Sequence, residues 1–208
     1  FIYAKQGKIQ SALNNIRSIE KPKGNNRIIL IQAESEILID EKRYDEALEV
    51  FTKAINEESH PDLLYSRAML AEKIDRIDLL EADLMRIIEN DPNNATALNA
   101  LGYTLADRSE RLDEAYNYIN RAYEISPNDF YILDSMGWVL YRLGRFEEAI
   151  DFLQQALDLR NDPEVAAHLG EVYWVMGNKK AAEDIWRTAL KNKPKDDKLL
   201  KIIERFKP

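Results

Sequence analysis

The residues best suited to acid–base or metal chemistry are the two histidines, His60 and His168. His168 follows Glu164 by four residues and precedes Glu171 by three, a spacing that puts the imidazole and both carboxylates on one side of a helix. A lone histidine with two carboxylates on one helix is common by chance, and neither histidine matches a known metal or nucleophile spacing. We therefore expect a structural or groove-edge role for this trio.

The rest of the sequence contains few residues suited to catalysis. No cysteine is present, which excludes thiolate nucleophiles and disulfides. Gly144, Gly170 and Gly177 each occupy a position with a packing or turn role, so no phosphate-binding loop is predicted. The sequon Asn94-Ala95-Thr96 is attributed to chance. We predict that the protein is not an enzyme and that it holds no cofactor and no metal.

The composition is that of a folded and acidic protein. Of the 208 residues, 45% are hydrophobic and 32% are charged, with both signs mixed along the chain and a net charge of −8. No cluster of lysine and arginine offers a track for phosphates, which argues against nucleic acid as a partner. No apolar run approaches the roughly 18 to 20 residues that span a bilayer, so no transmembrane segment is predicted.

Short segments built around proline recur along the chain at a spacing of about 34 residues, which indicates an internal repeat. These segments lie at 91–94, 126–129 and 193–196. Alignment on them divides the chain into a partial block at 1–27, full blocks at 28–60, 61–94, 95–129, 130–162 and 163–196, and a last helix at 197–206.

Each full block has a small residue where two antiparallel helices would cross closely. At the eighth position these residues are Ser35, Ala68, Gly102, Gly137 and Gly170. At a second crossing, Leu80 and Ile87 break the rule in block 61–94, so we expect its second helix to move outward or its neighbours to adapt. In the other blocks the second-crossing residues are Ala47, Ala54, Ala115, Ala122, Ala149, Ala156, Ala182 and Ala189.

Large apolar residues recur in the second half of each block. We expect them to pack the second helix of one block onto the first helix of the next. They are Phe51, Leu84, Ile119, Leu153 and Trp186.

This pattern resembles the tetratricopeptide repeat, most clearly in block 130–162. There, Met136-Gly137 precedes the run from Gly144 to Ala149. The resemblance implies an all-α fold, a tetratricopeptide α-solenoid in which antiparallel helix pairs form a right-handed superhelix. We expect residues 1–208 to form a single solenoid with a capping helix at 197–206.

The sequence also predicts how the two ends of the chain behave. The last helix places Leu199, Ile202, Ile203 and Phe206 on one face, with Lys198, Lys201 and Arg205 on the other, as a solvated cap would. The first residues resemble the tail of a helix that is already under way, so the chain is expected to be the carboxyl-terminal portion of a longer solenoid. Ile9 and Ile16 would then lack a stacking partner, which predicts self-association through that end.

In tetratricopeptide solenoids, the second, fifth, ninth, twelfth and thirteenth positions of each first helix line the concave wall. Tyrosine and tryptophan gather at these positions here, and both types are enriched in binding hot spots. For any one of them, the alternative is that it fills a gap between adjacent first helices. The predicted partner-binding residues are Tyr65, Met69, Asn99, Tyr103, Tyr131, Asp134, Trp138, Tyr141, Arg142, Glu171 and Trp174.

The same positions indicate what kind of protein or peptide would bind. Tetratricopeptide domains that hold the acidic carboxyl termini of chaperones use a clamp of lysine, asparagine and arginine. Here the matching sites hold Glu36, Met69 and Tyr103, so a basic or apolar segment suits the wall better than an acidic tail.

A closer resemblance rests on the stretches 100–108, 134–144 and 167–174, which are similar to the carboxyl-terminal part of bacterial tetratricopeptide lipoproteins. Some of those lipoproteins are adaptors of periplasmic carboxyl-terminal processing proteases. The resemblance implies a periplasmic scaffold anchored to the outer membrane that brings substrates to a protease. The alternatives are a regulatory or targeting region of a larger enzyme such as a glycosyltransferase, a cytoplasmic location, and a purely structural oligomer.

Overall fold

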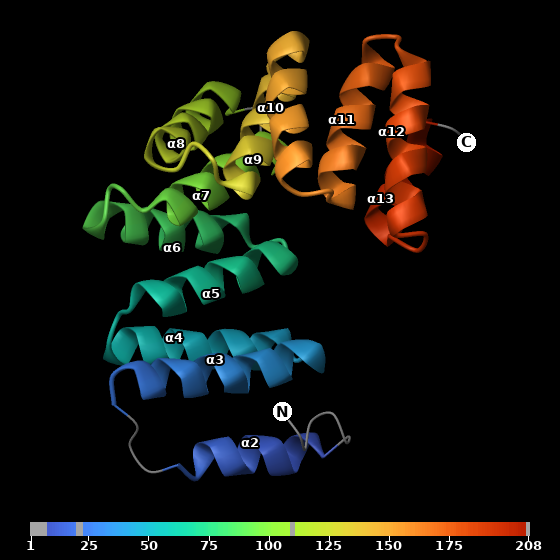
Figure 1. The fold of residues 1–208 in the computed structure, drawn as a ribbon. Helices are drawn as coiled ribbons and strands as arrows, with labels where there is room; N and C mark the ends of the chain where they lie inside the picture. Colours follow the sequence, from blue (N-terminus) through green and yellow to red (C-terminus); the bar gives the residue numbers. More distant parts are fainter. Residues whose placement is uncertain (1–7, 20–22, 109–110, 207–208) are drawn as a thin grey trace. The chain divides into compact units, whose positions relative to one another are not determined.

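The fold is described from a computed structural model in residues 8–19, 23–108 and 111–206. All regular secondary structure in these ranges is helical, which confirms the predicted all-α class (Figure 1). The helices are α2 (Ile9–Arg17), α3 (Asn25–Asp40), α4 (Tyr44–Glu57), α5 (Pro61–Lys73), α6 (Ile77–Asn90), α7 (Ala95–Arg108), α8 (Leu112–Ile125), α9 (Phe130–Arg142), α10 (Phe146–Leu159), α11 (Pro163–Val175), α12 (Lys179–Asn192) and α13 (Asp197–Phe206).

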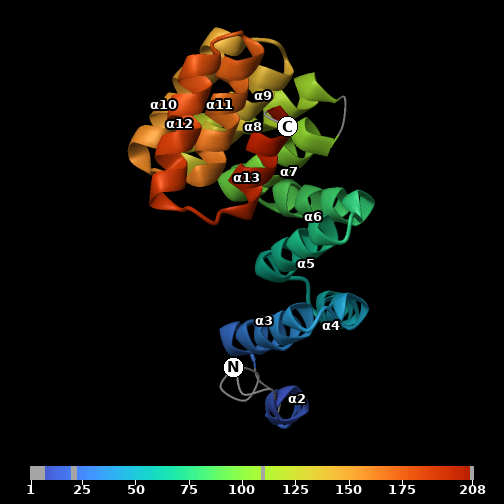
Figure 2. The ribbon, with the colours of Figure 1, turned by 90° about the vertical axis from the view of Figure 1, so that its right-hand side faces the viewer.

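The chain folds into two compact units, one that ends at Pro92 and one that begins at Asn93. In the first unit, α3 pairs with α4 and α5 with α6, and α2 packs on α3. In the second unit, the pairs are α7 with α8, α9 with α10 and α11 with α12, and α13 packs on α11 and α12 (Figure 2). We call the first helix of each pair the inner helix and the second the outer helix. Consecutive inner helices within a unit also contact one another.

Local sequence signals fix where these helices begin. The side chain of Asp129 caps α9 by accepting hydrogen bonds from the N–H groups of Tyr131 and Ile132. Asp162 caps α11 in the same way, and that helix starts with proline, which suits a first helical position. Because capping satisfies N–H groups that have no partner within the helix, these residues set the repeat boundaries.

The inner and outer helices of each pair cross at the small residues predicted from the sequence. A Cβ atom added to Gly102 would lie 2.6 Å from Ile119 Cγ1, one added to Gly137 would lie 2.4 Å from Leu153 Cγ, and one added to Gly170 would lie 2.0 Å from Trp186 Nε1. In the first unit, Ser35 and Ala68 are fully buried at the same position. Residues larger than these would force the helices apart.

These contacts add to the expectation about the large apolar residues. Ile119, Leu153 and Trp186 each lie against the glycine of their own pair, and Trp186 also stacks on Phe206 of the following helix α13, as expected. The reason is that a glycine at the crossing removes a side chain from the inner helix, and the large residue of the outer helix fills that space. The indole N–H of Trp186 also donates to the carbonyl of Ala167 on the inner helix of its pair.

The pair α5 and α6 accommodates its oversized residues, since Leu80 and Ile87 are both buried. This pair also contains a buried ion pair that the sequence analysis did not predict. Arg67 on α5 donates through Nε and Nη2 to the two carboxylate oxygens of Asp83 on α6, at 2.8 and 2.7 Å. Arg67 Nη1 donates in addition to Thr52 on α4, at 2.9 Å, so this network ties α4, α5 and α6 together.

The last helix packs through its apolar face, as the sequence analysis predicted. Leu199 is fully buried, and Ile202, Ile203 and Phe206 pack against a core cluster that includes Trp186. Arg205 was expected on the solvated face, but it also forms an ion pair with Glu171 on α11. Within the ranges described, no helix combines the length and the apolar character needed to cross a membrane.

Candidate protein-binding faces

The predicted binding residues of the second unit lie on α7, α9 and α11, but they differ widely in exposure. Tyr131 is 60% exposed, whereas Trp138 and Glu171 are buried, at 8% and 5%. The others in this unit are partly exposed, and so are Tyr65 and Met69 on α5 of the first unit. The partly exposed residues of the second unit are Asn99, Tyr103, Asp134, Tyr141, Arg142 and Trp174.

His168 joins two of the inner helices. Its Nδ1 atom on α11 lies 2.9 Å from Oδ1 of Asp134 on α9, and its ring stacks on Trp138 with the ring centroids 4.4 Å apart. Burial lowers the pKa of this imidazole, but the Asp134 carboxylate, with Glu164 and Glu171 beside it, outweighs burial and raises the pKa overall. The imidazole thus braces α9 against α11.

A second polar contact links α9, α11 and α13. The hydroxyl of Tyr141 donates to Glu171 Oε1 at 3.0 Å, and the other oxygen of Glu171 pairs with Arg205. Burial and the neighbouring carboxylate raise the pKa of Tyr141. Arg142 reaches in the opposite direction and donates to the carbonyl oxygens of Ala106 and Asp107 at the end of α7. Consecutive inner helices of the second unit are therefore tied by side chains at the predicted binding positions.

Trp174 belongs to an aromatic cluster at the end of the second unit. Its ring lies 5.7 Å from that of Trp186 and 6.0 Å from that of Phe206, and the ammonium of Lys179 stands 5.0 Å above it. Like Trp138, it therefore fills a space between helices, which is the alternative that the sequence analysis left open for each aromatic residue.

Tyr131 is the predicted residue that is most available to a partner. Its hydroxyl accepts a hydrogen bond from Arg160 Nη1 at 3.2 Å, and the guanidinium lies 5.7 Å from its ring centroid and 4.8 Å from that of Phe130. Arg160 is held in turn by Asp162 at 3.2 Å. The result is a fixed tyrosine–arginine surface at the start of α9.

The inner helices of the first unit present a different surface. Ile29 on α3 is 59% exposed, and Glu36 and Asp40 are exposed further along the same helix. The amide of Gln32 donates to the hydroxyl of Ser66 on α5 at 2.9 Å, which fixes the two inner helices to each other. This face combines an exposed aliphatic side chain with two carboxylates.

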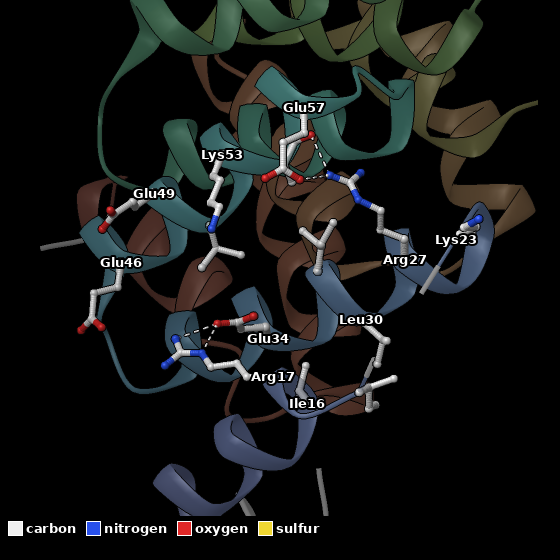
Figure 3. A pocket seen from close by; sticks show the side chains of 14 residues that line it. Ile16, Arg17, Lys23, Arg27, Leu30, Glu34, Glu46, Glu49, Lys53 and Glu57 are labelled. Atoms are coloured by element: carbon white, nitrogen blue, oxygen red, sulfur yellow. Dashed lines mark hydrogen bonds and ion pairs between the residues drawn. The ribbon is translucent and has the colours of Figure 1, made fainter. Parts of the chain in front are cut away.

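A pocket lies between α2, α3 and α4 in the first unit and was not anticipated from the sequence. Its volume is about 820 Å³. Figure 3 shows that Arg17 pairs with Glu34 on one side and Arg27 with Glu57 on another, while Lys53 extends from α4. Its apolar lining comes from Ile16, Ile19, Leu30, Ile31, Val50 and Ala54.

In the part of the chain that the structure describes, no group of three or more histidine and carboxylate side chains is arranged to hold an ion. Asp134, on the neighbouring helix, is the hydrogen-bond partner of His168.

Comparisons with protein families identify the repeat. Family models described as tetratricopeptide repeat match residues 32–59, 94–162 and 140–205. A TPR repeat-containing protein of Pseudomonas aeruginosa is 40% identical over 173 residues, which are 82% of this chain and 29% of that protein. The Hsp70-Hsp90 organizing protein of Triticum aestivum is 25% identical over 167 residues, 79% of this chain and 27% of that protein. The chain thus spans less than a third of either relative.

Solved structures match over most of the chain. A thermophilic TPR protein of Thermus thermophilus is similar with a TM-score of 0.71 and 26% identity, over 85% of this chain and 95% of that one. A tetratricopeptide repeat protein of Parabacteroides merdae matches with a TM-score of 0.76 over 91% of this chain and 75% of that one. Its 15% identity shows the fold alone. These likenesses confirm the solenoid class that the repeat pattern predicts.

Proposed function

Because the chain is built of tetratricopeptide repeats, whose proteins act as protein-interaction scaffolds, we propose that it binds partner proteins through the faces of its inner helices. The partner segments that suit these faces are basic or apolar. Each of the two units supplies a face of its own, on α3 and α5 in the first and on α7, α9 and α11 in the second.

One observation carries this proposal. Tyr131 and Ile29, at 60% and 59%, are the most exposed of the large hydrophobic residues described, and both stand at the second position of an inner-helix block. Neither side chain is buried in the core, so folding does not require a large hydrophobic residue there. An apolar or aromatic side chain left in water at a matching place in two units is what a binding surface retains.

The chemistry around these two residues supports a basic or apolar segment. Glu36 and Asp40 on the same helix as Ile29 would attract lysine or arginine side chains of a partner, and they would repel an acidic tail. In the second unit, a partner would pack on Tyr131 and the guanidinium of Arg160 that is stacked over it.

The contacts between inner helices support binding indirectly. His168 with Asp134, and Tyr141 with Glu171, hold α9 and α11 in one arrangement before any partner arrives. A surface that is already ordered loses less conformational entropy when it binds, which favours affinity.

The test compares captured partners between two variants of similar surface chemistry. The double variant Ile29→Ser/Tyr131→Ser removes one exposed side chain from each inner face. Leu159→Ser is the matched control, because Leu159 is 56% exposed but ends the outer helix α10. Affinity capture from cells of the source organism, read by mass spectrometry, should lose specific partners with the double variant and keep them with the control. Identical partner sets for wild type and the double variant would rule out these faces.

The more specific role implied by the closer resemblance is delivery of substrates to a periplasmic carboxyl-terminal processing protease. That role, and the outer-membrane anchor that goes with it, stay predictions. A captured protease that is lost with the double variant would support the adaptor role.

A further inference from the structure

The first inner helix has two core positions that are not fully covered. Leu30 and Ile31 are the third and fourth residues of their block and are partly exposed. At these two positions α5, α7, α9 and α11 carry residues that are at most 3% exposed: Leu63, Leu64, Ala97, Leu98, Ile132, Leu133, Val165 and Ala166. The repeat therefore normally covers a surface that is open on α3.

On α11 this surface is covered by the end of the preceding outer helix, α10. Leu157, near the end of α10, packs against the core cluster that includes Ala166 of α11. A large residue also stands four positions before the closing prolines that follow α8 and α12, as Tyr123 and Leu190. The residue four positions before Pro22 is Ser18, which is exposed.

The length of α2 adds to this difference. It has 9 residues, whereas α4, the next outer helix, has 14. The groove left between α2 and α4 holds about 820 Å³, against about 410 Å³ for the corresponding groove lined by α10, α11 and α12. An apolar surface that is covered elsewhere by a helix is here exposed at the floor of an open pocket.

The charges around the pocket indicate what the covering segment would carry. Arg17 is paired with Glu34 at 2.7 Å, and Arg27 with Glu57 at 3.0 Å, so these four groups largely neutralise one another. Two further carboxylates line the pocket, Glu46, which is paired with Arg43, and Glu49. Lys53 extends from α4 over the apolar lining, and Lys23 stands at the edge (Figure 3). A carboxylate on the covering segment would be attracted where it lies beside Lys53 or Lys23 and away from Glu49.

We propose that this pocket is a docking site for an amphipathic helix of a partner protein. The helix places a large apolar residue on Leu30 and Ile31 and a carboxylate near Lys53, and so takes the place on α3 that the end of α10 takes on α11. The site is separate from the inner faces, because Ile29 faces away from the core while Leu30 lines the pocket.

The first experiment tests whether the floor of the pocket is open. The chain has no cysteine, so single-cysteine variants report one position each. Leu30→Cys should react with a maleimide at least about tenfold faster than Leu63→Cys, its fully buried counterpart on α5. Equal, slow rates would show that the chain covers this position itself, and would overturn the proposal.

The second experiment uses a defined probe, a fluorescent, hydrocarbon-stapled peptide with the sequence of residues 146–159. This outer helix carries Leu157, which covers the matching position on α11, followed by Asp158. Fluorescence anisotropy should show saturable binding that weakens about tenfold with Leu30→Gln in the protein, because a buried leucine contributes at least that much. Lys53→Glu, on an exposed site, should weaken it about two- to fivefold. A peptide with Leu157→Gln should bind as weakly as the Leu30→Gln protein does.

Ile29→Gln is the control that separates this site from the inner face. It should leave peptide binding unchanged while it reduces capture of inner-face partners. Absence of saturable binding up to about 1 mM peptide, or equal affinity for wild type and Leu30→Gln, would overturn the proposal. A dimer in light scattering that Leu30→Gln abolishes would assign the pocket to a second copy and would contradict the partner assignment.

Discussion

At the residue scale, Gly170 is the glycine that leaves the least room for a side chain, because it faces Trp186. A Cβ atom at position 170 would lie 2.0 Å from the indole nitrogen, which leaves no room for a methyl group, and Trp186 lies in the core of the last pair. Gly170→Ala should therefore lower the free energy of unfolding by about 1–3 kcal/mol, measured by urea denaturation.

A second substitution distinguishes overpacking from a general effect of losing glycine. Trp186→Leu removes the ring that the new methyl group would strike. In the double variant, Gly170→Ala should cost less than it does alone, with a coupling energy of about 1 kcal/mol or more. If the unfolding free energies lost in the two single variants simply add in the double variant, the clash with Trp186 is not what makes Gly170→Ala destabilising.

His168 gives the fold a dependence on pH whose sign follows from its surroundings. The pKa is raised in the folded state, so the protonated ring contributes stability in full below the unfolded pKa of about 6.5, and this contribution is lost as the pH rises through the folded pKa. Asp134→Asn removes the main cause of the increase. The stability advantage of wild type over this variant should be largest below about pH 6.5 and should shrink as the pH rises above it in urea titrations. His60 is present in both proteins, so its titration cancels in the comparison. An advantage that grows with pH would contradict the assignment.

Residue types and their spacing predicted which positions are small or aromatic, but they did not predict which side chains contact one another. The small residue at each crossing follows from the repeat, because close helix packing allows little else. Trp138 and Tyr131 both fit a binding position, yet one is buried against His168 and the other is exposed. Whether such a residue is buried depends on the side chain that the neighbouring inner helix places against it. The pattern within one block gives no information about that neighbour.

At the scale of elements, a buried ion pair joins α5 to α6, in addition to the small residue Ala68 at their crossing. Asp83 is 1% exposed and accepts both hydrogen bonds from Arg67. Asp83→Ala should cost about 3–5 kcal/mol of unfolding free energy, because it leaves a buried guanidinium without its counter-charge. The double variant Arg67→Met/Asp83→Leu should recover most of that loss in the same denaturation experiment. A double variant as unstable as Asp83→Ala would show that packing, and not the unpaired charge, sets the cost.

Helix boundaries were predictable because caps and closing prolines recur at the repeat spacing, as Asp129 and Pro127 illustrate. The pocket beside α3 was not. It arises from a short outer helix and from Ser18 at a position that other blocks fill with a large residue. The small residue Ser18 was visible in the alignment of the blocks. Its consequence, an uncovered apolar surface on α3, becomes apparent only when the exposure of equivalent positions is compared in the structure.

At the scale of the whole molecule, each unit combines braced inner helices with a surface that is left open. The second unit uses most of its predicted binding residues to tie α7, α9, α11 and α13 together and leaves Tyr131 exposed. The first unit leaves Ile29 exposed beside carboxylates and an open pocket on the other side of α3. Self-association through the amino-terminal end stays a prediction, which light scattering over a range of concentrations would test.

The central claim is that partners bind on the inner helices, and site-specific photocrosslinking tests it most directly. The absence of native cysteine allows a photoactivatable maleimide to be placed at Thr96→Cys, an exposed second position on inner helix α7 that leaves Tyr131 and Ile29 intact, or at Gln155→Cys, an exposed position on outer helix α10. The claim predicts crosslinked partner proteins from position 96 and few or none from position 155. Partners that crosslink from position 155 and not from position 96 would contradict it.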